Sequence, residues 1–305
     1  MKVFGVSLVR DEADIILPNV LHHLALGLDR ILVVDNGSTD GTDELLRELA
    51  AKDERVSWRG DESAFDQVRI TTDLAREALR QGADWVLPFD ADEFWYSEHR
   101  SFRKALANSE AGALKVPVAN FVQAREVREP APEALLTMTH RVAEPVGPGK
   151  FCRELIESQE ISFAEMAYPD KWVFRPRPVI EVHRGNHKVV GIDGPREESG
   201  ELVCLHAPLR SRDSLEAKAV QGRRLDEAGV PKDSAWNHRR WARLQDEGKL
   251  DAEWAANSYE DGTLDVYGKR LELFRDHRLR DALSPLVPVK AHRRKSFLRR
   301  LVNRR

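Results

Sequence analysis

Short apolar runs alternate with segments of helical periodicity along the first ninety residues. Apolar runs at residues 3–9, 30–35, 56–58 and 84–89 predict buried strands. Between them, residues 14–28, the segment after residue 40 and residues 66–81 carry apolar side chains at helical spacing. Apolar strands separated by amphipathic helices predict an α/β fold, a Rossmann-like and mostly parallel sheet flanked by helices.

The pattern changes after residue 92. Strands are expected at residues 113–118, 120–122, 171–175, 179–183 and 201–205, and those at 171–175 and 179–183 are expected to be antiparallel. Helices are expected at 213–228, 234–245 and 266–275. We therefore predict one domain at residues 1–210, a mainly helical C-terminal appendage at 211–289 and a basic tail at 290–305.

Composition narrows the class of protein. The chain has 305 residues, 41% hydrophobic and 32% charged, which is enough apolar material for a core and too much for a disordered chain. No apolar run approaches the roughly 20 residues that span a bilayer. The first residues enter a strand pattern without a secretory signal, and two cysteines cannot form a disulfide framework. We expect a cytoplasmic protein.

Charge is distributed unevenly along the chain. Residues 290–305 hold eight Lys or Arg and no acid, whereas the rest of the chain is strongly acidic. No basic face extends over the predicted fold, so a nucleic-acid partner is not expected. As a helix, the tail would place Phe297, Leu298, Leu301 and Val302 on one side, typical of peripheral attachment to an anionic membrane surface at its inner face. The alternative is a disordered, solubilising tail.

Acidic residues stand where two predicted strands end, and ligands of parallel sheets bind beyond the carboxyl ends of the strands. Asp90-Ala91-Asp92 follows one apolar strand, and two such carboxylates can bind Mg²⁺ or Mn²⁺ together with a diphosphate. The alternative for this triplet is a solvated turn. Asp35 follows another strand and could accept from a nucleobase N–H or a ribose hydroxyl, although a tight turn explains the residues at 37–41.

Several ordered motifs resemble one enzyme family. Arg10-Asp11-Glu12 is followed by VVDNGSTDGT at 33–42 and DWVLPFDADEF at 84–94, and later by KWVFRP at 171–176 and LHAPLRSRDSLEAKAVQG at 205–222. This order resembles the nucleotide-sugar glycosyltransferases of family 2, which have the GT-A fold, and is similar to their family 2-like type 4 branch, related to family 92. The match covers residues 3–96 well and is thin over 97–170. Ala207 stands where the branch usually has Tyr.

The resemblance implies a role for each matching residue. Asp35, Arg10 and Glu12 would line the nucleoside pocket. Asp90 would face ribose or metal, Asp92 would bind the metal, and His206 would complete the metal site or contact the diphosphate. Arg210 and Lys218 would also bind the diphosphate. A metal ion and the side chains of Arg210 and Lys218 would stabilise a departing nucleoside diphosphate, whose negative charge grows as the glycosidic bond breaks.

The catalytic base is not identified by spacing. The resemblance implies an inverting reaction, which needs a carboxylate to accept the proton of the attacking hydroxyl. Glu181, Asp193 and Glu160 lie in the region expected to form the acceptor side, and nothing in the sequence chooses among them. His183 and His187 flank a predicted turn, either as hydrogen-bonding residues of that turn or near the acceptor or diphosphate.

We therefore expect an inverting glycosyltransferase that uses Mn²⁺ or Mg²⁺ and moves a sugar from a nucleoside-diphosphate donor, UDP-sugar first, to a hydroxyl of a glycan or glycolipid. One alternative is a catalytically inactive, membrane-peripheral module that binds nucleotide sugars. A nucleotidyltransferase is a further alternative, but it needs a glycine-rich loop after the first strand, and residues 9–13 contain no glycine.

Overall fold

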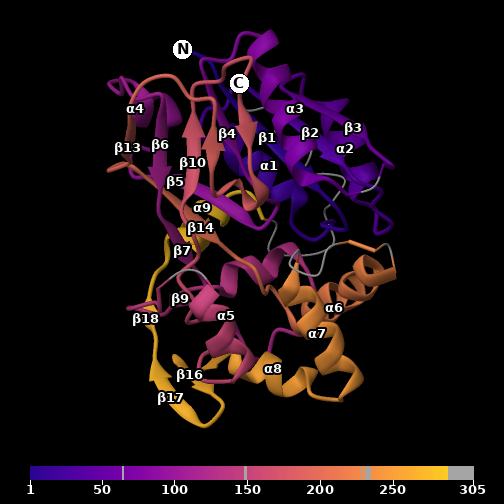
Figure 1. Ribbon diagram of the computed structural model, residues 1–305. Helices are drawn as coiled ribbons and strands as arrows, with labels where there is room; N and C mark the ends of the chain where they lie inside the picture. Colours follow the sequence, from indigo (N-terminus) through magenta and orange to yellow (C-terminus); the bar gives the residue numbers. More distant parts are fainter. Residues whose placement is uncertain (64, 148–149, 228, 231–234, 288–305) are drawn as a thin grey trace. The chain divides into compact units, whose positions relative to one another are not determined.

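The computed structural model describes residues 1–63, 65–147, 150–227, 229–230 and 235–287, and the chain divides into two compact units. Unit 1 comprises Met1–Ala119, Pro169–His206 and Ala282–Arg305, and unit 2 comprises Asn120–Tyr168 and Ala207–Asp281. Both units are therefore built from separate stretches of sequence (Figure 1). The division into domains at residues 210 and 289 stays a prediction, and the basic tail at 290–305 lies outside the described residues.

Unit 1 is built on a seven-stranded sheet in the order β13-β6-β10-β4-β1-β2-β3. Its strands are β1 (Val3–Val9), β2 (Arg30–Asp35), β3 (Val56–Gly60), β4 (Trp85–Pro88), β6 (Ala113–Val116), β10 (Lys171–Phe174) and β13 (Arg196–Glu198). Strand β1 runs parallel to β2 and β4, β2 to β3, and β13 to β6. Only β10 is antiparallel to its neighbours β4 and β6 within this sheet. The predicted α/β fold with a mostly parallel sheet is confirmed, as is the antiparallel direction of the strand at 171–175.

Smaller elements complete unit 1. Its helices are α1 (Ile16–Ala25), α2 (Thr42–Ala50), α3 (Gln67–Arg80), α4 (Phe102–Leu106) and the 3₁₀ turn η2 (Arg184–Asn186). Further strands are β5 (Glu93–Ser97), β11 (Glu181–Val182), β12 (Val189–Val190) and β14 (Leu202–His206), while β7 (Val118–Asn120) and α9 (Arg278–Leu283) cross the boundaries of the two units. Strand β14 pairs antiparallel with β5.

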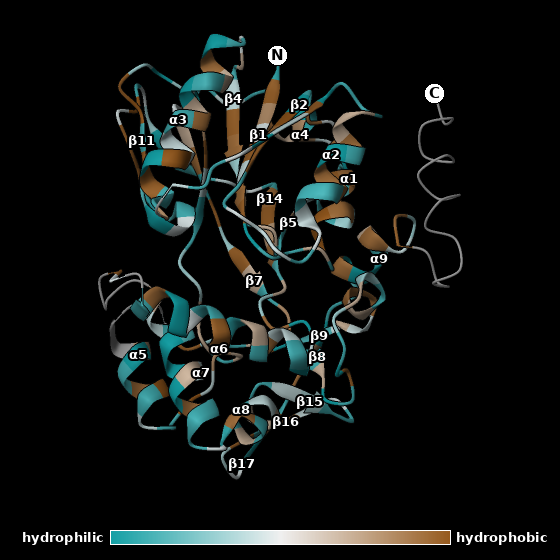
Figure 2. Ribbon diagram, turned by 90° about the vertical axis from the view of Figure 1, so that its right-hand side faces the viewer, coloured by the Kyte–Doolittle hydropathy of each residue, from teal (hydrophilic) through white to brown (hydrophobic). Residues whose placement is uncertain are grey.

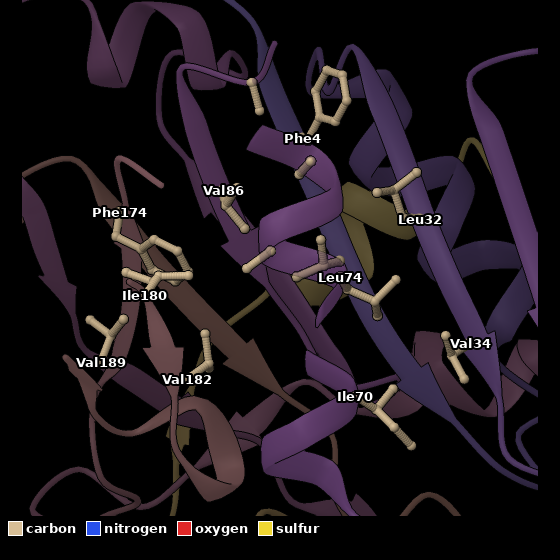
Figure 3. Close-up of a cluster of buried hydrophobic side chains, with 14 of the residues drawn as sticks. Phe4, Leu32, Val34, Ile70, Leu74, Val86, Phe174, Ile180, Val182 and Val189 are labelled. Carbon is tan, nitrogen blue, oxygen red and sulfur yellow. The ribbon is translucent and has the colours of Figure 1, made fainter. Parts of the chain in front are cut away.

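Helix α3 supplies much of the packing on one face of the sheet. Asp66 caps it by accepting from the N–H of Arg69, and Ile70 and Leu74 then point toward the strands. Figure 3 shows them among Phe4 of β1, Leu32 of β2 and further side chains of the same buried cluster. Each such side chain contributes roughly 1.5–3 kcal/mol when it is buried. In Figure 2, β1 and β4 are largely hydrophobic, whereas α3 shows both colours, as the sequence pattern predicts.

Unit 2 combines helices with short strands. It contains α5 (Lys150–Glu157), α6 (Arg212–Glu227), α7 (Trp236–Asp246), α8 (Leu250–Ala256), η1 (Pro132–Thr137), β8 (Gln123–Ala124), β9 (His140–Arg141), β15 (Ser258–Glu260), β16 (Thr263–Val266), β17 (Lys269–Glu272) and β18 (Phe274–Arg275). Its core includes Trp241, Trp254 and Leu215. The expected helices at 213–228 and 234–245 correspond to α6 and α7.

The helix expected at residues 266–275 is wrong, because the chain forms a hairpin of β16 and β17 there. Val266 pairs with Lys269, so Tyr267 and Gly268 make a two-residue turn. Both have positive φ, 50° and 92°, the conformation that such tight hairpin turns require and that glycine adopts readily. The apolar residues at 264, 266 and 271 therefore lie in strands, although their spacing also fits a helix.

No helix within the described part of the chain is both long enough and apolar enough to cross a membrane.

Candidate active site

The parallel strands bring the predicted acidic exits to one edge of the unit 1 sheet. Val9 of β1 pairs with Asp35 of β2, and Val6 of β1 pairs with Pro88 of β4. Because these three strands run in the same direction, the chain leaves Asp35 and the segment after Pro88 at the carboxyl edge. This is the edge at which open α/β sheets bind ligands.

Hydrogen bonds join the loops that follow β1 and β2. The N–H groups of Asp11, Glu12 and Ala13 donate to the side chains of Ser38, Thr42 and Asp40, at 2.9, 2.8 and 2.9 Å. In return, the Asp11 carboxylate accepts from the N–H of Thr39 at 2.7 Å. These contacts hold the predicted nucleoside-side segment 10–12 against the turn at 36–42.

The side chain of Asp35 is buried and accepts from its own turn. Its carboxylate accepts from the N–H of Ser38 at 3.1 Å and from the Ser38 hydroxyl. The turn chemistry noted in the sequence is therefore real, and any contact of Asp35 with a nucleoside would add to this local role. Arg10, in contrast, is exposed, with its Nε 3.9 Å from Oδ2 of Asp11.

Strand pairing places His206 beside the acidic triplet. His206, the last residue of β14, pairs with Glu93 at the start of β5. Its Nε2 lies 3.8 Å from Oδ1 of Asp92, and both side chains are mostly buried. Two of the three predicted metal ligands are thus neighbours.

Asp90 accepts from three side chains on separate elements. Its Oδ2 lies 3.2 Å from Nζ of Lys171 on β10, and its Oδ1 accepts from Asn186 at 3.3 Å and from Gln67 at 3.5 Å. The carboxylate remains 31% exposed. Asp90 is therefore held in one orientation while it still faces solvent.

Lys171 and Glu93 form a buried ion pair directly behind the triplet. The Lys171 side chain is 5% exposed and contacts Oε1 of Glu93, and its Nζ also donates to the carbonyl of Gly185 at 2.6 Å. Burial raises the pKa of Glu93 above its usual value, as do the neighbouring Asp90 and Asp92 carboxylates, whereas the charge of Lys171 lowers it and favours the carboxylate. Burial alone would lower the pKa of Lys171, but Glu93 and Asp90 raise it above its usual value, so the side chain stays cationic.

The turn at residues 183–187 completes the surroundings of Asp90. Gly185 has φ of 63° and Asn186 of 59°, and a Cβ on Gly185 would approach the His187 ring to 2.5 Å. The Gly185 N–H donates to Oε1 of Gln67 at 3.1 Å. Burial, followed by the charge of Lys171, lowers the pKa of His187 to about 4, so this ring is neutral near pH 7. The interpretation of His187 as a residue of the turn is compatible with these contacts.

Two of the three base candidates belong to unit 1 and one belongs to unit 2. Glu181 of β11 is half-exposed, with Oε1 3.3 Å from Nε2 of His183, and the N–H of Val182 donates to Thr72 of α3. Asp193 is 78% exposed and pairs with Arg177. Its carbonyl lies beside Gly112, just before β6. This end of β6 is the one farther from the carboxyl edge of β4. Glu160 belongs to unit 2 and accepts from the Ser158 hydroxyl. Within unit 1, Glu181 and Asp193 therefore do not share one site.

The predicted diphosphate-binding residues Arg210 and Lys218 belong to unit 2. Arg210 is buried, and its carbonyl accepts from Nε2 of Gln123 at 2.7 Å. Lys218 lies on α6. Their contribution to the diphosphate site stays a prediction.

A divalent cation fits this chemistry with help from a substrate. Among the described residues, no group of three or more His, Cys, Asp or Glu is arranged to hold a metal ion. Asp92 and His206 nevertheless offer a carboxylate and an imidazole side by side, and Mg²⁺ usually takes one or two carboxylates and completes its shell with phosphate oxygens and water. The remaining ligands would therefore come from water or, with a substrate bound, from a diphosphate.

Sequence reasoning missed Lys171, Glu93 and Asn186 at this site. Glu93 follows the triplet directly, and Lys171 opens the KWVFRP strand, so both stood in segments already recognised as informative. The signal that could have identified Lys171 is its place at the start of an apolar strand. A lysine buried in such a strand needs an anionic partner, which would have pointed to the acids nearby.

Part of the chain is similar to known proteins. Residues 9–143 match the family model described as Glycosyl transferase family 2. Over 86 residues the chain is 37% identical to a TPR repeat-containing protein of Synechococcus elongatus. The aligned segment covers 28% of this chain and 19% of that protein. The chain thus matches about a fifth of the length of this curated relative.

The chain is also similar to solved structures. The crystal structure of S. aureus TarS 1–349 aligns with 84% of this chain and 71% of that chain, at 12% identity and a TM-score of 0.38. The structure of TarS 1–349 in complex with UDP-GlcNAc aligns with 77% and 69%, at 11% identity and a TM-score of 0.39. The family match spans less than half of the chain, includes both loops of the carboxyl edge and the acidic triplet, and agrees with the resemblance of the sequence motifs to family 2.

Proposed function

We propose that this protein transfers a glycosyl group from a nucleoside-diphosphate sugar, UDP-sugar first, to a hydroxyl of a glycan or glycolipid, with inversion at the anomeric carbon. The observation that carries the proposal is the carboxyl edge of the seven-stranded sheet, where Asp35 ends β2 and Asp90 and Asp92 come after β4. His206, the last residue of β14, lies beside Asp92. Acids at such an edge favour a ligand that brings a cation or hydrogen-bond donors.

In this proposal Asp92 and His206 would hold a divalent cation, Mn²⁺ or Mg²⁺. When bound, the cation would neutralise charge on the departing diphosphate. Asp92 would act as its anionic ligand, and His206 would contribute an imidazole nitrogen, or would instead donate to a phosphate oxygen. Arg210 and Lys218 are proposed as further diphosphate contacts, from the family resemblance of their segment alone.

The segment 10–12 and Asp35 would bind the nucleoside. The contacts between this segment and the turn at 36–42 support the proposal, because they fix the backbone before a ligand arrives. Asp35 would accept from a nucleobase N–H or a ribose hydroxyl in addition to its bonds with Ser38.

For the base, we propose Glu181 as the first carboxylate to test. The segment that starts at Glu181 continues into the turn whose Asn186 donates to Asp90. Asp193 and Glu160 remain candidates without a comparable connection. The base would take the proton of the attacking hydroxyl as that oxygen bonds to the anomeric carbon and the diphosphate departs.

The test is the substitution Asp92→Ala. We expect the release of UDP from a panel of UDP-sugars to fall at least about 100-fold, because a site that stabilises developing charge loses an anionic ligand for its cation. Calorimetry should also show the loss of Mn²⁺-dependent UDP binding.

Glu48→Ala is the matched control, since Glu48 is an exposed acid on α2 that pairs with Lys52. It should leave turnover and UDP binding unchanged. Unchanged Mn²⁺-dependent binding in Asp92→Ala would contradict the metal role of Asp92. UDP binding without turnover for any donor in the native protein would favour the inactive binding module.

A further inference from the structure

The feature that the proposed function leaves unexplained is a lysine buried behind the acidic triplet. Lys171 opens β10, whose partner strands are β4 on one side and β6 on the other. Strand β10 is antiparallel to β4, so its first residue lies toward the carboxyl edge of β4, next to the segment that holds Asp90. The position of Lys171 thus follows from the one antiparallel insertion in this sheet.

The ammonium group of Lys171 contacts two carboxylate oxygens and one carbonyl oxygen, each from a different residue. It lies 3.2 Å from Oδ2 of Asp90 and contacts Oε1 of Glu93, and it donates to the carbonyl of Gly185 at 2.6 Å. Buried ammonium groups are strongly disfavoured unless they are paired, so these contacts fix the side chain at this place.

The opposite oxygen of Asp90 is held as well. Asn186 and Gln67 donate to Oδ1, at 3.3 and 3.5 Å. Asn186 is 3% exposed, and its own Oδ1 is a buried acceptor without a hydrogen-bond partner in the described structure. A turn with two consecutive positive φ values presents this amide, and glycine and asparagine are the residues that adopt this conformation most readily.

We propose that Lys171 is a positioning residue that acts as a built-in cation for Asp90 and Glu93, so that a divalent cation depends on Asp92 and His206 rather than on Asp90. This inference rests on the proposed function, and it assigns different tasks to the two acids of the triplet. Asp90, held by Lys171, Asn186 and Gln67, would present an oriented acceptor to the donor. Asp92 would carry the cation.

The proposal has a consequence that a purely structural lysine would not have. Asp90 and Asp92 flank a single residue, and without Lys171 they would form a cluster of two carboxylates with no fixed cation. Such a cluster attracts divalent cations. Loss of the lysine should therefore increase the affinity for a metal even though it damages the site.

The experiment measures Mn²⁺ binding alone, without nucleotide, by electron paramagnetic resonance of the free ion. For Lys171→Met we expect a dissociation constant at least about tenfold lower than in the native protein, because a positive charge close to the ion is removed. UDP-sugar turnover should fall in the same variant, since Asp90 loses the donor that orients it.

A second comparison, made in the Glu93→Gln variant, tests the proposal if Lys171→Met alone does not fold. Glu93→Gln combined with Lys171→Met removes both buried charges, which is far less damaging than removing one. The double variant should bind Mn²⁺ at least about tenfold more tightly than Glu93→Gln alone.

Lys115→Met is the matched control. Lys115 lies on the neighbouring strand β6 and pairs at the surface with Asp170, 2.9 Å away, so its loss changes the net charge by the same amount. We expect Mn²⁺ affinity within about twofold of the native value, because exposed charges are screened by solvent and salt.

Equal Mn²⁺ affinity with and without Lys171 in both backgrounds would overturn the proposal, and so would an equal gain in Lys115→Met. The measurement needs no donor sugar. A gain in Mn²⁺ affinity in a protein that transfers no sugar would therefore support the role of Lys171 while the proposed glycosyl transfer fails.

Discussion

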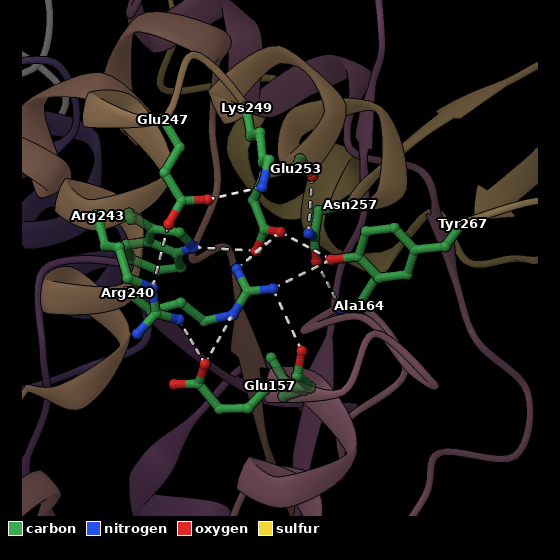
Figure 4. A network of polar contacts seen from close by, with 11 residues as sticks. Glu157, Ala164, Arg240, Arg243, Glu247, Lys249, Glu253, Asn257 and Tyr267 are labelled. Carbon is green, nitrogen blue, oxygen red and sulfur yellow. Dashed lines mark hydrogen bonds and ion pairs between the residues drawn. The ribbon is translucent and has the colours of Figure 1, made fainter.

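Both units bury a cationic side chain against carboxylates, but the two clusters differ in what they leave exposed. In unit 2, Nη1 of Arg240 lies 2.8 Å from Oε2 of Glu253, which also accepts from the Tyr267 hydroxyl at 2.7 Å (Figure 4). Trp241 donates to the other carboxylate oxygen at 3.2 Å. Arg240 and Glu253 are each 2% exposed.

In unit 1, Lys171 is buried as deeply, yet its partner Asp90 keeps 31% of its side-chain surface open to solvent. The unit 2 cluster connects α7 and α8 with the turn between β16 and β17, so its contacts act on the fold. The unit 1 cluster ends at the carboxyl edge of a parallel sheet, where a ligand can reach one member. Burial of an ion pair therefore does not identify a functional site, whereas burial behind a solvent-facing acid does point to one.

Arg240→Met should produce the largest effect on stability. It leaves the Glu253 carboxylate buried without its cation, and breaking a buried pair in this way typically costs about 3–5 kcal/mol of unfolding free energy. Urea denaturation would measure the loss. Mn²⁺ affinity of the folded protein should not change, in contrast to Lys171→Met.

Arg243→Met is the control for that variant. Arg243 lies on the same helix, is 55% exposed and pairs with Glu157. Its loss should cost less than about 1 kcal/mol, as is usual for exposed pairs. Losses of similar size for the two arginines would remove the distinction between the buried cluster and the surface.

Acid should affect unit 1 before unit 2. Burial lowers the pKa of His22 and His187 to about 4, and that of His23 well below its usual value. The unfolded chain therefore takes up protons first as the pH falls below about 6.5, and stability is lost between about pH 6.5 and 4. For His22 alone, this amounts to about 2 kcal/mol at pH 5.

Unit 2 has a different acid response. Burial alone would raise the pKa of Asp276, but hydrogen bonds from Arg278 and Arg141 lower it to about 2. The stability that Asp276 contributes is therefore lost only as the pH falls below about 3.8. Burial and Arg275 also lower the pKa of His140, which is less deeply buried than His22 and His23 of unit 1. Hydrogen exchange by mass spectrometry at pH 7 and pH 5 would compare the units.

His22→Gln is the control for the acid response. Nε2 of His22 lies 2.7 Å from the Trp95 carbonyl, to which a glutamine amide can also donate. The variant should lose less stability than the native protein between pH 7 and pH 5. Earlier loss of protection in α6 and α7 of unit 2 than in the unit 1 sheet would contradict the prediction.

Tyr267→Phe should have the smallest effect. It removes the hydroxyl that bonds Glu253 but leaves Arg240 in place, so we expect a loss of about 1 kcal/mol in unfolding free energy. Tyr259→Phe, which removes a bond to the Thr137 carbonyl at the surface, should cost less than about 0.5 kcal/mol. A larger loss for Tyr259→Phe would show that Tyr267 has no special place in the cluster.

Local patterns predicted those parts of the fold that depend on neighbouring residues. The apolar runs predicted β1, β2 and β4 at their correct places, and the residues at 37–41 predicted the turn that follows β2. The same method failed at residues 266–275, where apolar spacing fits a helix and a strand alike. There the two positive φ values at Tyr267 and Gly268 decide for a hairpin.

Thus the sequence by itself determined the α/β class, the strand exits and the chemistry gathered at Asp90 and Asp92, because periodicity and turn propensity act over a few residues. Only the tertiary structure decided which distant residues meet there. Lys171 reaches Asp90, 81 positions away, through the antiparallel insertion of β10, and His206 reaches Asp92 through the pairing of β14 with β5. Such pairings are set by the packing of the whole sheet, and no short window of sequence contains them.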